Sequence, residues 1–129
     1  MNGFLKYIQS QPGFMAMKPV DGDEIKKAER ALNVTFAKDY AEYIKACGAA
    51  TFDCYELTGI CASKRLNVVD VTLAQRKIDP NVPQNLYVVE ECGIDGACMW
   101  QDADGSVYCI VPGNAPRKVA DNLLDYVEE

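Results

Sequence analysis

Cysteine is the residue type in this chain with the most chemical potential, because thiolates bind metals and act as nucleophiles. The chain has no histidine and 6 cysteines, which are Cys47, Cys54, Cys61, Cys92, Cys98 and Cys109. None of them forms the C-x-x-C pair of a structural zinc site, and a catalytic thiol would lack the histidine that usually activates it. A domain of this length does not need disulfides to fold. We therefore expect reduced thiols that fill the core as small apolar groups.

Acidic side chains form the second group of candidate residues, which are Glu90, Glu91, Asp95, Asp102 and Asp104. Adjacent residues of a strand point to opposite faces, so Glu90 and Glu91 cannot form the paired carboxylates of a glycosidase. Asp102 and Asp104 resemble the start of a calcium loop, but the third acidic position and the final glutamate of that motif are missing. The glycine-rich stretches contain neither G-x-G-x-x-G nor a P-loop lysine. The sequence therefore predicts no catalytic site, no metal site and no cofactor.

These acidic residues lie in residues 86–111, LYVVEECGIDGACMWQDADGSVYCIV, which predict three antiparallel strands joined by short turns. The first and last strands of this stretch are almost continuously apolar, which is typical of strands covered on both faces. Gly93 and Gly96 bracket Ile94 and can supply the positive φ that a turn needs. Residues 102–105 end in Asp-Gly, a strong signal for a tight hairpin. We expect this β-meander to be the centre of the fold.

Helices are predicted both before and after the meander along the sequence. Apolar residues recur at helical spacing in residues 4–11, 21–32, 37–47, 70–77 and 119–127. The last segment places Val119, Leu123 and Val127 on one face, and residues 49–61 are expected to be extended. This order predicts an α+β fold with a mainly antiparallel central sheet and helices packed around it. The length of 129 residues suits a single domain over residues 1–129.

The formal net charge is −6 and is unevenly distributed. Residues 79–129 contain 10 acidic and 2 basic residues, whereas residues 1–78 contain 9 acidic and 11 basic residues. Such a surface repels nucleic acid and attracts a basic protein, although acidic side chains also simply keep proteins in solution. The chain lacks both an apolar run of the ~20 residues that a membrane span needs and a signal-peptide pattern. We expect a cytoplasmic protein that binds neither nucleic acid nor membrane.

A set of short motifs is spread over nearly the whole chain. In the first half they are Ile25, Glu29, Leu32, Asp39-Tyr40, Tyr43-Ile44, Gly48, Leu57-Thr58-Gly59 and Asn67-Val68-Val69. In the second half they are Pro83, Leu86-Tyr87-Val88-Val89-Glu90, Gly93-Ile94-Asp95-Gly96, Gln101-Asp102 and Gly105 through Tyr108. Together these motifs resemble those of the SUKH superfamily. One departure is Phe36-Ala37, where the family often has Leu-Pro. That proline would pre-set entry into the following helix, and its loss should cost little.

The superfamily contains a fungal cell-wall-synthesis regulator and many immunity proteins of bacterial polymorphic toxins. The resemblance implies a compact α+β domain without a cofactor, which acts in the cytoplasm by binding and occluding a toxin, often a nuclease. We expect a basic toxin surface to meet an acidic rim made of Glu90, Glu91, Asp95, Asp102 and Asp104. Tyr87 or Trp100 would serve as the anchor of this interface.

The fold alone would also account for each of these residues, as hairpin aspartates, strand-end glutamates or core aromatics. Two other functions stay open at this point. One is a non-enzymatic regulatory or scaffold protein of the cell-wall-regulator branch. The other is an enzyme or small-ligand protein, which would need a concave pocket with convergent polar groups.

Overall fold

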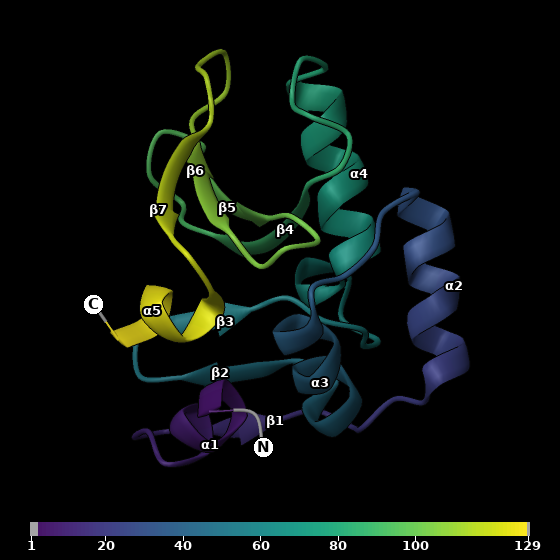
Figure 1. Cartoon of the computed structure of the whole chain (residues 1–129), viewed down its shortest axis with the longest axis vertical. Coiled ribbons are helices and arrows are strands. Elements are labelled where there is room, and N and C mark those ends of the chain that lie inside the picture. The colour runs from purple at the N-terminus through teal and green to yellow at the C-terminus, as the bar shows by residue number, and fades with distance from the viewer. Residues whose placement is uncertain (1–2, 129) are drawn as a thin grey trace.

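Two antiparallel sheets and five α-helices make up the fold (Figure 1). This computed structural model describes residues 3–128, and the counts refer to that range. In chain order the elements are α1 Gly3–Gln9, β1 Met15–Ala16, α2 Gly22–Leu32, α3 Lys38–Cys47, β2 Ala50–Phe52, β3 Tyr55–Leu57, the 3₁₀ helix η1 Lys64–Leu66, α4 Val68–Ile78, β4 Tyr87–Glu91, β5 Cys98–Gln101, β6 Val107–Ile110, β7 Arg117–Ala120 and α5 Leu123–Glu128. The sheet orders are β1-β2-β3 and β4-β5-β6-β7. The predicted α+β fold class is confirmed.

The predicted β-meander is confirmed as strands β4, β5 and β6, which are antiparallel neighbours. Gly93 and Gly96 take positive φ values of 75° and 73° in the turn between β4 and β5. A hydrogen bond of 3.1 Å from the Gly105 N–H to the Asp102 carbonyl closes the turn between β5 and β6. Both turns depend on neighbouring residues only, which is why the sequence pattern reveals them.

The helices predicted before the meander are also confirmed, with small shifts at their ends. In α2, the predicted apolar stripe of Ile25, Ala28 and Leu32 is buried. Helix α4 begins at Val68 rather than at residue 70. The reason is its N-cap, Asn67, whose side chain accepts hydrogen bonds from the first turn of the helix.

The C-terminal segment differs from the prediction. Val119 is not helical but lies in β7, which pairs with β6, and α5 begins only at Leu123. The Asn122 side chain accepts a hydrogen bond of 2.8 Å from the Asp125 N–H and caps this short helix. Strand pairing prevails over helical periodicity here because β7 satisfies the backbone groups along the otherwise open edge of β6.

Apolar side chains form two core clusters on opposite faces of β4. The larger cluster contains Tyr87 and Val89. It joins the sheet of strands β4–β7 to the sheet of strands β1–β3 and to helices from both halves of the chain. The smaller one contains Val88 and is covered by Val71 of α4. The predicted two-sided cover is confirmed at β4, whose first four residues are buried. It holds only in part at β6, the other strand for which it was made, because Val107 and Ile110 are buried but Tyr108 and Cys109 are partly exposed.

Thr58, which lies between the two sheets, forms hydrogen bonds with both α3 and β4. The hydroxyls of Tyr40 and Thr58 lie 2.8 Å apart, and Thr58 Oγ1 donates to the Val88 carbonyl at 2.7 Å. The Thr58 N–H also donates to the Val89 carbonyl at 2.9 Å. The two sheets are therefore fixed relative to one another by buried polar contacts as well as by apolar packing.

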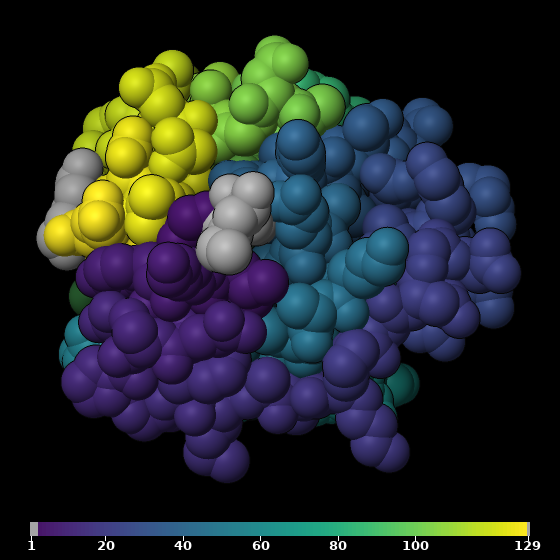
Figure 2. Space-filling view, turned by 60° about the horizontal axis from the view of Figure 1, so that its bottom comes forward, coloured from purple at the N-terminus to yellow at the C-terminus, as the bar shows by residue number. Residues whose placement is uncertain are grey.

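The first and last helices lie side by side. A Cβ added to Gly3 would lie 3.6 Å from a methyl group of Leu124 in α5. Figure 2 shows the purple surface of the first helix next to the yellow surface of the last. Packing of α1 against α5 closes the core at the end of the molecule where both are found.

Candidate protein-binding surface

A buried chain of hydrogen bonds connects several of the motif residues. The Ala37 N–H donates to the Tyr87 hydroxyl at 2.8 Å, and this hydroxyl donates to Gln101 Oε1 at 2.7 Å. The Gln101 amide nitrogen donates to Asp39 Oδ1 at 3.1 Å. The other Asp39 oxygen accepts a bond of 3.0 Å from the Leu123 N–H. The network ties α3 to the meander and to α5, so these residues serve the fold.

Tyr87 and Trp100 are core residues, with exposed fractions of 0% and 2%. The Tyr87 ring meets Phe36 edge to face, with centroids 4.8 Å apart. Trp100 belongs to the core cluster that α4 covers. The prediction that one of them anchors a partner is wrong, because both faces of the sheet are covered where these side chains lie.

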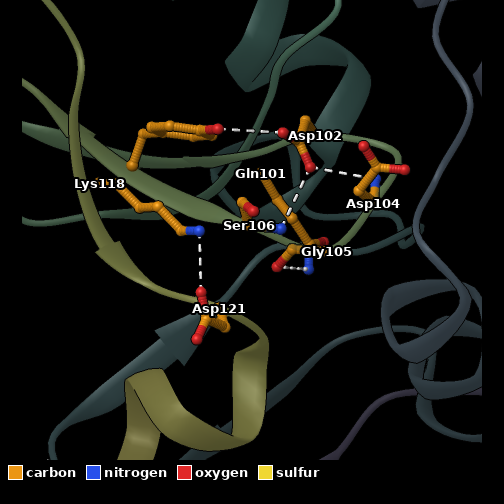
Figure 3. Close-up of polar contacts among 8 residues, drawn as sticks. Gln101, Asp102, Asp104, Gly105, Ser106, Lys118 and Asp121 are labelled. Carbon is orange, nitrogen blue, oxygen red and sulfur yellow. Dashed lines mark hydrogen bonds and ion pairs between the residues drawn. The ribbon is translucent and has the colours of Figure 1, made fainter.

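Asp102 and Asp104 lie in the turn between β5 and β6 (Figure 3). Asp102 Oδ1 accepts hydrogen bonds from the backbone N–H groups of Asp104 (3.0 Å) and Ser106 (3.1 Å). Its other oxygen accepts a bond of 3.1 Å from the Tyr108 hydroxyl. Asp102 therefore holds the turn together, whereas Asp104 is exposed.

More carboxylates lie at the same end of the sheet, where β7 leads into α5. Lys118 Nζ lies 2.8 Å from Asp121 Oδ1, and this hydrogen bond and charge lower the pKa of the Asp121 carboxyl (Figure 3). The Asp121 carbonyl would lie 3.5 Å from a Cβ on Gly105, so the hairpin packs against this junction. Asp125 and Glu128 also line the shallow hollow of about 600 Å³ at the junction.

Glu90 is buried, with 7% of its surface exposed, although the sequence predicted it at an interface rim. One carboxylate oxygen accepts a hydrogen bond from the Tyr126 hydroxyl of α5, and the other accepts one of 2.9 Å from the Glu56 N–H of β3. Burial raises the pKa of the Glu90 carboxyl, and these two hydrogen bonds offset only part of that effect. Because Glu90 fastens β4 to β3 and α5, it has no free surface for a rim.

Glu91 and Asp95 are exposed, as a role at an interface rim requires. The Glu91 carboxylate lies 3.5 Å from the side-chain nitrogen of Gln75, which is at the outer limit of a hydrogen bond. Asp95 lies in the turn between β4 and β5, with a positive φ of 56°. Its side chain makes no hydrogen bond or ion pair with the rest of residues 3–128.

The acidic candidates do not form one continuous surface. The turn with Asp95 precedes the first residue of β5, and the turn with Asp102 and Asp104 follows its last residue. The 4 residues of β5 separate the two turns, which corresponds to about 13 Å at ~3.3 Å per residue. The structure therefore has two acidic ends, one at each end of the meander.

A cleft of about 600 Å³ lies between the β2–β3 hairpin and the end of β4. Its lining includes Phe52, Asp53, Tyr55, Glu56, Glu90, Glu91 and Cys92. Arg65 pairs with Glu56 at 2.6 Å, and both side chains are largely exposed. Sequence reasoning missed Asp53 and Glu56, because a long stretch of chain separates them from Glu91 and only the packing of the two sheets brings them together.

The whole chain matches a known family. A family model described as SUKH_5, SMI1-KNR4 cell-wall, matches residues 1–129. The chain belongs to the SUKH superfamily. No curated protein sequence matches it.

A solved structure has the same fold as this SUKH protein. It is the crystal structure of a protein from Pseudomonas syringae pv. tomato, with a TM-score of 0.75. The two chains are 11% identical, and the match covers 100% of this chain and 96% of the other. At this identity the likeness concerns the fold alone.

Three thiols of this SUKH protein, those of Cys47, Cys92 and Cys98, are poorly suited to nucleophilic catalysis because burial raises their pKa values. Cys47 and Cys98 are buried, as expected of small apolar core residues, whereas Cys54 is exposed. Burial raises the pKa of Cys98 to about 12 and that of Cys92 to about 11, so both thiols are protonated at neutral pH. SUKH proteins are in general non-enzymatic.

Residues 3–128 of this SUKH protein show neither a metal site nor a membrane-spanning helix. In that range no three His, Cys, Asp or Glu side chains are grouped so that they could hold a metal ion. None of the helices there combines the length and the apolar character that crossing a bilayer requires. The two ends of the meander carry exposed acidic residues, and the family is associated with protein–protein interactions.

Proposed function

We propose that this SUKH protein is an immunity-type protein, which binds a cognate protein toxin and neutralises it by covering the toxin's functional surface. The family includes immunity proteins. The toxin is a basic protein, in our proposal a nuclease, and the complex forms in the cytoplasm. The protein acts as one domain and performs no reaction of its own.

The observation that carries this proposal is the presence of exposed carboxylates that form no ion pair. Glu91 and Asp95 at one end of the meander, and Asp104 and Asp125 at the other, are exposed and form no ion pair with residues 3–128. A nuclease must hold a polyanion, so it presents cationic groups that such carboxylates complement. Complementary charge speeds the encounter, and contacts buried in the complex set the dissociation rate.

Co-expression with a toxin domain encoded by a neighbouring gene tests the proposal. The toxin domain alone should stop growth, and this protein should restore growth and co-purify with the toxin domain in a stoichiometric complex. An unrelated basic protein of similar size is the control, and it should not co-purify. A toxin domain that stays lethal and unbound in the presence of this protein would show that the proposal is wrong.

A regulatory or scaffold role of the cell-wall-regulator branch is the second candidate, favoured by the cell-wall description of the matching family. The same fold and acidic surface would then recruit a cellular protein instead of a toxin. Gene context separates the two roles, because only an immunity protein is expected beside a gene for a large secreted protein with a C-terminal toxin domain. Deletion of the gene should alter sensitivity to cell-wall stress only if the regulatory role is correct.

A further inference from the structure

Ile94 is an apolar side chain that the fold holds out in solvent. It is 72% exposed, and the other exposed large apolar residues of the described chain are Met15, Met17, Leu73 and Ile78. Its turn is closed by hydrogen bonds from the Ala97 N–H to the Ile94 carbonyl (2.8 Å) and from the Cys92 N–H to the Ala97 carbonyl (3.0 Å). Because the backbone is already held, covering Ile94 with a partner costs little conformational entropy.

Carboxylates surround this turn. Glu91 ends the strand that leads into it, and Asp95 lies within it. The cleft that begins at the end of β4 adds Asp53 and Glu56 from the β2–β3 hairpin. Arg65 pairs with Glu56 at the edge of this group of carboxylates, and its charge also interacts with that of Glu91. An apolar centre beside a charged rim is the usual anatomy of a protein–protein interface.

The opposite end of the meander lacks this combination. None of the exposed large apolar residues of the described chain lies in the β5–β6 turn or in α5. Asp102 is engaged in holding the turn, and Asp121 is paired with Lys118. The fold itself therefore accounts for much of the acidity at that end.

We propose that the β4–β5 turn and its adjoining cleft are the docking site for a basic protein, with Ile94 as the apolar anchor and Glu91 and Asp95 as the acidic rim. The matching surface of the partner has an apolar hollow for the isoleucine, surrounded by arginine or lysine side chains. One such cation enters the cleft, whose lining includes the aromatic residue Tyr55 and the acidic residue Asp53. The inference rests on the proposed function for the identity of the partner.

The location of the docking site is tested by measuring the binding of the toxin domain encoded by the neighbouring gene. One catalytic residue of that toxin domain is substituted to inactivate it. Ile94→Ser should weaken the affinity about tenfold or more, mainly through faster dissociation, because truncating an interface anchor removes a large part of the binding energy. The double variant Glu91→Gln/Asp95→Asn should instead slow association, and its effect should shrink as salt is added.

Two matched control variants remove the same kinds of group elsewhere. Ile78→Ser removes an exposed isoleucine from α4, and Asp104→Asn/Asp125→Asn removes two exposed charges from the other end of the meander. Both should change the affinity less than about twofold, as for residues outside the anchor of an interface. Equal melting temperatures of all variants and the wild type would show that the fold is intact.

Amide hydrogen exchange of the wild-type complex gives an independent readout that needs no variant. Protection on binding should appear in residues 91–97 and in the β2–β3 hairpin. Protection confined to residues 102–106 and α5, or an Ile94→Ser variant that binds like the wild type, would overturn the location but leave the proposed function standing. A wild-type protein that does not bind the toxin domain would overturn both.

Discussion

Glu90 is a buried carboxylate that joins three elements of the fold, since it lies in β4 and accepts hydrogen bonds from β3 and α5. Glu56, Tyr55, Tyr126 and Cys92 are the titratable groups that interact with it. None of them is a cation, so nothing in its immediate surroundings compensates the negative charge directly. The stability of the fold should therefore depend on whether Glu90 carries a proton.

We predict that Glu90 makes the protein more stable at low pH than at neutral pH, relative to a variant without this carboxyl. Burial raises its pKa in the folded chain above the ordinary 4.5, so the folded state binds the proton more tightly than the unfolded state. This contribution is complete below the unfolded pKa and is lost as the pH rises through the folded pKa. The free energy of unfolding of the wild type minus that of Glu90→Gln should fall as the pH rises above the ordinary value of 4.5.

Urea unfolding at several pH values measures this difference. Glu128→Gln, which removes an exposed carboxyl of α5, is the control for general effects of charge. A wild-type minus Glu90→Gln difference that stays constant or rises with pH would contradict the role assigned to burial.

The Tyr87 hydroxyl gives a second prediction at the scale of one residue. Tyr87→Phe removes the acceptor of the Ala37 N–H and the donor to Gln101, and it leaves both partners buried. We expect a loss of about 2 kcal/mol in the free energy of unfolding, which is typical of a buried polar group left without its partner. Tyr108→Phe removes the same atom from a half-buried site and should cost clearly less. Similar losses in the two variants, measured by urea unfolding, would argue against the importance of the network.

At the scale of elements, the close approach of Gly59 to Gly48 sets how η1 and β3 pack against the end of α3. A Cβ on Gly59 would lie 1.7 Å from the Gly48 carbonyl oxygen, which is backbone and cannot rotate away. Gly59→Ala should therefore lower the free energy of unfolding by at least about 3 kcal/mol, as a severe form of overpacking. Gly22→Ala is the matched control, because a Cβ there meets nothing within 4 Å. Thermal unfolding of both variants checks this, and equal melting temperatures would contradict the contact.

The elements that the sequence pattern predicted well are those with local causes. The β5–β6 turn follows from Asp-Gly, and α2 follows from an apolar stripe in which Ile25, Ala28 and Leu32 recur at helical spacing. One element that it missed, β7, has a non-local cause. Val119 fits the helical spacing of Leu123, yet β7 exists because β6 offers an edge that only another strand can pair with.

At the scale of the whole molecule, charge should control how fast a basic partner arrives. The net charge of −6 and its concentration in the second half favour electrostatic steering. We predict that the association rate constant with the toxin domain falls about tenfold between roughly 0.05 M and 0.5 M salt, because the Debye length shortens over this range. Stopped-flow mixing measures the rate, and a value independent of salt would exclude steering.

The motif residues lie in two different parts of the molecule. Asp39, Tyr87 and Gln101 lie in the buried network that joins α3, the meander and α5. Ile94 and Asp95, which also belong to the motifs, lie at the surface of the molecule, in a turn whose glycines take positive φ values. The resemblance to the SUKH superfamily therefore predicted the fold correctly, but it does not identify the partner.

The sequence by itself determined the fold class, the meander and most helices of this protein, because turns, caps and apolar periodicity depend on residues within a few positions of one another. Only the tertiary structure decided that Glu90, Tyr87 and Trp100 are buried and that the acidic candidates divide between two ends. It alone brought Asp53 and Glu56 next to Glu91. Burial and strand pairing depend on surfaces far apart in the chain, and the packing of the two sheets selects among them.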